Sequence, residues 1–91
     1  MNDNEVLNLL EEAARKLEMV VEYDDLRKGA VNTQGGTFIL RGEKHILLHR
    51  YLSVKEKIEL LTEILSGQET EGVELPPVVR RKLESARNSL K

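Results

Sequence analysis

The sequence predicts an α+β domain: a small three-stranded sheet from about Met19 to His49, packed by an N-terminal helix and a capped central helix, followed by a C-terminal helix. Two observations support this class. Apolar residues recur at helical spacing towards both ends of the chain, whereas aliphatic and β-branched residues run consecutively in its middle. A chain of 91 residues can bury one core but not two, so we expect a single domain over residues 1–91.

The first helix is expected to begin at a cap on Asp3 or Asn4 and to end at about Lys16. Asp and Asn side chains accept hydrogen bonds from the free N–H groups of a first helical turn. The apolar stripe of this helix consists of Val6, Leu7, Leu10, Ala13, Ala14 and Leu17. Residues 19–23 are then expected to form a short strand that ends at two turn-prone aspartates.

After an irregular segment over residues 26–34, a glycine pair opens a predicted β-hairpin. Its strands are residues 37–41 and 45–49, joined by a short turn over residues 42–44. Because a strand rather than a helix follows the glycines, we interpret the pair as a bulge or a tight strand entry and not as a phosphate-binding loop. The apolar residues are consecutive rather than alternating, so we expect both faces of the hairpin to be partly covered by helices.

The second helix has clear boundaries in the sequence. Ser53 and Glu56 form a predicted capping box, and Gly67 stands where a left-handed C-cap is expected. Its inner stripe consists of Val54, Ile58, Leu61 and Leu65, widened by Leu60 and Ile64. The last helix is expected to begin at Leu75-Pro76-Pro77, since proline suits a first turn. Its weaker stripe consists of Val79, Leu83, Ala86 and Leu90.

Composition excludes several classes of site. Because the chain contains no cysteine, it has no disulfide, no thiolate metal site and no cysteine nucleophile. Its only aromatic residues are Phe38, Tyr23 and Tyr51, so platforms for stacking nucleobases are nearly absent. The acidic N-terminus does not resemble a signal peptide, and no apolar stretch approaches the roughly 20 residues of a membrane helix. We therefore expect a cytoplasmic protein with no membrane partner.

The charge is unevenly distributed along the second half of the chain. Residues 53–75 hold two lysines and six glutamates, whereas residues 76–91 hold five basic residues and one glutamate. The basic set could contact phosphates; it includes Arg80, Arg81, Lys82 and Arg87. The pI of about 5.7 and the acidic helix before this set argue against a nucleic-acid partner. An exposed sheet edge or the weak last helix fits an unidentified protein partner or a homodimer better.

The segment T-E-I-L-S at residues 62–66 lies on the second helix, directly after the hairpin. Over residues 20–67 this arrangement resembles the core of minimal zincin-like metallopeptidases, whose active helix carries the motif H-E-x-x-H. The resemblance places Thr62 at the first histidine, Glu63 at the catalytic glutamate and Ser66 at the second histidine. The two histidines hold the zinc ion that activates water. Without them, the resemblance implies a metal-free core with no cofactor and no peptidase activity.

The chain as a whole also resembles a small uncharacterised family of bacterial proteins. The stretches that carry this resemblance are Gly35-Gly36, Leu40-Arg41-Gly42, residues 52–61 and residues 72–80. The resemblance implies no activity, because no function is established for that family.

Two histidines remain as candidates for chemistry. On one strand, His45 and His49 would lie on the same face but about 13 Å apart, beyond the reach of ligands that share one ion. We expect each to lie at the hairpin surface, where one could pair with a glutamate. A hydrolase that uses Glu63 with His49 is the alternative function. On a 3.6-residue period, however, Glu63 lies about 200° from both Leu61 and Leu65, so it should point away from the inner stripe.

These observations favour a non-catalytic intracellular module for protein interaction or an accessory role, built on a core that resembles zincins and is free of metal. No catalytic, cofactor-binding or metal-binding residue is assigned by this interpretation. The cryptic, metal-independent hydrolase with Glu63 and His49 remains the competing hypothesis.

Overall fold

The computed structural model describes residues 1–26 and 35–89, except for the side chain of Ser89. The elements in chain order are α1 (Asp3–Lys16), β1 (Met19–Asp24), β2 (Gly35–Leu40), β3 (Glu43–His49), α2 (Val54–Ser66) and α3 (Pro77–Ser89). This confirms the α+β class, with a helix at each end of the chain and one directly after the hairpin. The expected irregular segment beyond Leu26 and the stripe residue Leu90 fall outside the described residues.

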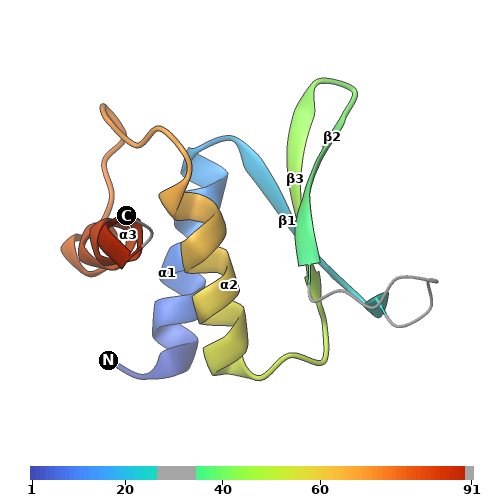
Figure 1. Cartoon of the computed structure of the whole chain (residues 1–91), viewed down its shortest axis with the longest axis horizontal. Helices are drawn as coiled ribbons and strands as arrows, with labels where there is room; N and C mark the ends of the chain where they lie inside the picture. Colours follow the sequence, from blue (N-terminus) through green and yellow to red (C-terminus); the bar gives the residue numbers. More distant parts are fainter. Residues whose placement is uncertain (27–34, 90–91) are drawn as a thin grey trace.

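The elements form three layers, with α1 and α2 side by side between the sheet and α3 (Figure 1). The buried apolar side chains form one cluster that joins these layers. Its members are Val6, Leu10, Ala13, Ala14, Met19, Ile46, Leu48, Ile58, Leu61, Leu65, Leu75, Val79 and Leu83. The expected helical stripes supply most of them, because one apolar face per helix is what a layered core requires. None of the described helices is both long and apolar enough to cross a bilayer.

The sheet has the strand order β1-β3-β2, with β1 parallel and β2 antiparallel to β3. The hairpin turn consists of Arg41 and Gly42, both with positive φ, of 53° and 79°. The expected turn over residues 42–44 is therefore wrong. A two-residue turn with two positive φ angles matches the right-handed twist of the strands, so β3 begins at Glu43 and Leu40 pairs with it.

The first residue of β2, Gly35, lies where no side chain would fit. Its φ is +154°, and a Cβ built there would lie 2.4 Å from the carbonyl oxygen of Leu47. Only glycine fits this close approach of two strands. Of the two alternatives for the glycine pair, a bulge or a tight strand entry, the structure shows the tight strand entry.

Both α1 and α2 begin at a polar side chain that accepts a hydrogen bond from the first helical turn. The capping box of α2 is confirmed: Glu56 N donates to Ser53 Oγ at 3.2 Å, and Ser53 N donates to Glu56 Oε1 at 3.0 Å. These bonds, led by the one from the Ser53 backbone, lower the pKa of Glu56. The cap of α1 is Asn2 rather than Asp3 or Asn4, since Asn2 Oδ1 accepts from Glu5 N at 2.9 Å.

The expected left-handed C-cap at Gly67 is wrong, because this residue has right-handed angles, φ −84° and ψ −1°. A side chain from α3 serves the end of α2 instead. Arg87 Nε donates to the Ser66 carbonyl at 2.7 Å, and its Nη2 donates to the Gln68 carbonyl at 2.8 Å. A cation at the C-terminal carbonyls of a helix also complements the helix dipole.

Candidate functional site

One face of the sheet combines polar chemistry with exposed apolar side chains. Successive residues of a strand point to opposite faces, and in β3 the buried Ile46 and Leu48 point into the core beside α1 and α2. We call the opposite face the outer face. The strand register places the following residues on it: Val20, Glu22 and Asp24 of β1, Glu43, His45, Leu47 and His49 of β3, and Gly36, Phe38 and Leu40 of β2.

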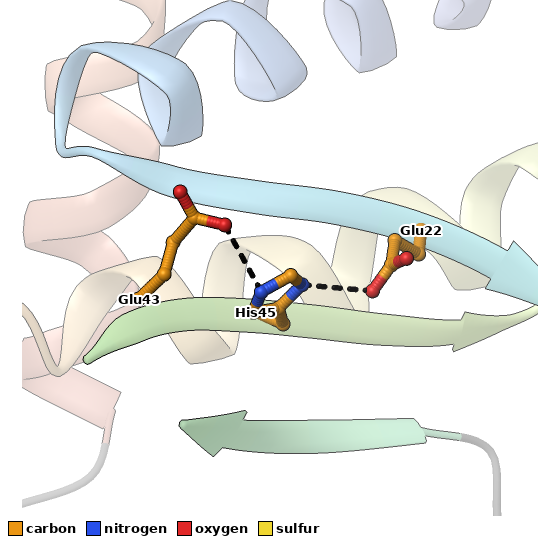
Figure 2. A network of polar contacts seen from close by, with 3 residues as sticks. All are labelled: Glu22, Glu43 and His45. Atoms are coloured by element: carbon orange, nitrogen blue, oxygen red, sulfur yellow. Dashed lines mark hydrogen bonds and ion pairs between the residues drawn. The ribbon is translucent and has the colours of Figure 1, made fainter. Parts of the chain in front are cut away.

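His45 lies between two carboxylates on the outer face, one from β1 and one from its own strand (Figure 2). Its Nδ1 is 2.9 Å from Glu22 Oε2, and its Nε2 is 3.2 Å from Glu43 Oε1. The ring also stacks on Phe38, its cross-strand partner, with centroids 5.0 Å apart and planes 12° apart. These three neighbours leave His45 only 8% exposed.

The expectation that His45 lies at the surface is therefore wrong, whereas its pairing with a glutamate is confirmed. A carboxylate only accepts hydrogen bonds, so both contacts can be hydrogen bonds only when both ring nitrogens carry a proton. The two carboxylates and the stacked Phe38 ring fix the orientation of the imidazole. In residues 1–26 and 35–89, no three His, Asp or Glu side chains are grouped so that they could hold a metal ion.

Phe38 belongs to an exposed apolar strand. Phe38, Ile39 and Leu40 are 41%, 69% and 53% exposed. Strand β2 is an edge of the sheet, and no described strand pairs with its second side. The expectation that helices cover both hairpin faces is wrong for the described chain, because α1 and α2 lie on the same side and the turn end projects beyond them (Figure 1).

Tyr23 connects the opposite edge of the sheet to the helices. Its hydroxyl donates to Glu11 of α1, and the Lys57 ammonium of α2 lies 5.1 Å from the centre of its ring. Burial, with the hydrogen bond and the negative charge of Glu11, raises the pKa of Tyr23 well above its ordinary value. Tyr23 is therefore a persistent hydrogen-bond donor that ties β1 to α1.

The two residues of the hydrolase hypothesis lie in different surroundings. Glu63 is exposed and lines a groove of about 290 Å³ whose other residues include Lys82 of α3. His49 ends β3, where its Nδ1 accepts from Leu26 N at 3.2 Å and its ring meets Tyr51 edge-on. Within the part of the chain that the structure describes, no hydrogen bond or ion pair joins Glu63 to His49.

The two positions that the zincin resemblance matches to histidines differ in their contacts. Ser66 is buried, and its hydroxyl donates to the Glu63 carbonyl at 2.7 Å. Thr62 lines the same groove as Glu63, and its buried Oγ1 has no partner among the described residues.

Two members of the basic set on α3 bind backbone carbonyls. Arg87 holds the end of α2, and Arg80 Nη2 donates to the Val73 carbonyl at 2.7 Å. Both side chains are half-buried, as is Lys82, whereas Arg81 is exposed. Arginine provides several donors in a planar fork, so one side chain can hold a whole loop.

Sequence reasoning did not single out Glu22, Glu43 or Phe38. A turn over residues 42–44 pairs residue 41 with residue 45, which places Phe38 opposite Leu48. The actual turn at Arg41 and Gly42 pairs Phe38 with His45. The preference of hairpins for turns with two positive φ angles could have revealed that pair. The contact of Glu22 with His45 depends on the parallel β1–β3 pairing, which no local sequence pattern predicts.

No model of a known protein family, no curated protein and no solved structure matches the chain. The outer face and the edge strand β2 are therefore the features that bear on its function.

Proposed function

We propose that the protein is a non-catalytic, cytoplasmic protein-interaction module that binds through β2 and the adjoining outer face. The observation that carries the proposal is the exposure of three consecutive apolar side chains, Phe38, Ile39 and Leu40, on an edge strand. An edge strand presents unpaired backbone groups to any extended chain, and exposed apolar side chains add affinity.

The His45 cluster supports this use of the outer face. Glu22 and Glu43 hold the imidazole in one orientation, and the imidazole in turn supports one side of the Phe38 ring. A preorganised aromatic side chain loses little conformational entropy on binding, which is why such residues serve as anchors in interfaces. The cluster thus has a role that needs no catalysis.

The proposed metal-free, zincin-like core is compatible with the same role. It is supported by the position of α2 directly after the β2–β3 hairpin and by the hydrogen bond of Ser66, which lies at one of the two positions matched to metal ligands. A scaffold of this kind would retain the sheet and helix while its surface binds a partner.

Site-specific photo-crosslinking in the native host tests the proposal. A photoreactive phenylalanine analogue is placed at Ile39, and the matched control carries it at Arg81, an exposed position on the far helix layer. We expect a discrete protein adduct at position 39 and none at position 81. Equal adducts at the two positions, or none at position 39, would contradict the proposal.

A further inference from the structure

We infer that the strand that binds β2 is β2 of a second copy of this chain, in antiparallel pairing about a two-fold axis at Phe38. The inference rests on the proposed function, because it names the partner of the same edge. The two sheets would then join into one sheet of six strands, with the outer faces on the same side.

The two edge strands, β1 and β2, differ in the charge that they would bring against a second copy of themselves. Edge strand β1 carries Glu22 and Asp24, so two copies of β1 would bring like charges together. Edge strand β2 has the sequence G-G-T-F-I-L, with no charge and no proline. Charged residues and proline are the usual protection of edge strands, and β2 lacks both. An uncharged edge meets its own copy without repulsion.

The faces of the strand limit the possible registers. A two-fold axis perpendicular to the sheet keeps the outer faces together, so a residue of the outer face must lie opposite another one. A register centred on Phe38 fulfils this condition. It places Phe38 opposite Phe38, Gly36 opposite Leu40 and Thr37 opposite Ile39.

The pairing of Gly36 with Leu40 is complementary in volume. Apart from Gly36 itself and its two chain neighbours, no described residue has an atom within 4 Å of the position that a Cβ would take at Gly36, so this part of the outer face is open. Leu40 is 53% exposed and would fill that space on the second copy. The same register brings two Phe38 rings into a cross-strand pair, an arrangement that stabilises antiparallel strands.

Because the chain contains no cysteine, introduced thiols can report the register directly. One chain carries Gly36→Cys and another carries Leu40→Cys, so both keep Phe38. On mixing under mild oxidation, we expect a disulfide-linked heterodimer, since directly opposed residues have Cα atoms within the range of about 4.4–6.8 Å that a disulfide spans.

The same variants provide the matched controls. In the proposed register, two copies of residue 36 are four positions apart along the strands, about 13 Å, so either variant alone should give only background linkage. A chain with Tyr51→Cys, at a position that is 61% exposed but off the edge, should give background linkage with Gly36→Cys. A heterodimer yield no higher than in these controls would overturn the register and the self-pairing.

Sedimentation equilibrium of the unmodified chain supplies a second measurement. We expect a mass of twice 10.4 kDa, and Ile39→Glu should weaken dimerisation, raising the dimer Kd at least about tenfold. Ile39 is 69% exposed and pairs with Lys44, so the glutamate should leave the monomer folded, which circular dichroism checks. A monomer at all concentrations, or a dimer insensitive to Ile39→Glu, would overturn the inference.

The crosslink at position 39 separates the two proposals. A monomer whose position 39 captures a different protein overturns self-pairing and leaves the interaction module intact. A monomer with no adduct at position 39 overturns both.

Discussion

Single side chains in this protein show their roles through partners on other elements. Tyr23 donates to Glu11 across the α1–β1 contact, and His45 takes contacts from two strands besides its own. Glu63, by contrast, is exposed, and the side-chain contact that reaches it is the Ser66 hydroxyl, which donates to its backbone carbonyl. These differences lead to opposite expectations for substitution.

Tyr23 should make stability fall at alkaline pH. Its pKa is raised in the folded state, so its contribution is complete below the ordinary pKa of about 10 and is lost as pH rises above it. Urea titrations between pH 8 and pH 11 should show a decline that Tyr23→Phe reduces. In a Tyr51→Phe background, ultraviolet titration follows Tyr23 alone; ionisation near pH 10 in the folded protein would refute the expectation.

Glu63→Gln should leave the free energy of unfolding unchanged within about 0.5 kcal/mol, because substitutions at exposed positions without partners have small effects. Denaturant titration measures this. The same variant tests the hydrolase alternative: any hydrolytic activity of the purified protein that Glu63→Gln abolishes would contradict the non-catalytic interpretation.

Among the elements, helix α2 has ends that are set in two different ways. Its beginning is set by the capping box of Ser53 and Glu56, three residues apart. Its end depends on Arg87, which lies 21 residues beyond Ser66. The capping box needs only residues within one helical turn, whereas the Arg87 contact requires α3 to be packed against α2.

The two contributions to α2 should differ in size. Ser53→Ala removes one cap and should cost about 1 kcal/mol of unfolding free energy. Leu61→Ala empties space in the core, where Leu61 is fully buried, and should cost about 2–5 kcal/mol. Equal, small losses in denaturant titration would mean that α2 is not packed against the sheet and α1 as described.

Arg87→Ala should cost about 1–3 kcal/mol, because it leaves half-buried carbonyls at the end of α2 without a donor. The exposed Arg81→Ala is the matched control and should stay within about 0.5 kcal/mol. Hydrogen exchange of residues 66–70 should also accelerate in the Arg87 variant alone. Similar losses in both variants would indicate a general charge effect.

For the whole molecule, we expect no stoichiometric transition metal. The chain lacks cysteine, and both nitrogens of His45 already face carboxylates. Elemental analysis of protein purified without a histidine tag should find zinc far below one ion per chain. A full equivalent of zinc that His45→Ala removes would contradict this expectation and reopen the question of a metal site.

The sequence by itself determined the helices, the capping box and the glycine entry to β2, because these depend on contacts within about four residues or on one residue's backbone freedom. Only the tertiary structure decided the strand order, the burial of His45 and the role of Arg87. Glu22 meets His45 across 23 positions of sequence, and Arg87 reaches Ser66 across 21. Such contacts depend on strand pairing and helix packing, which local patterns leave open.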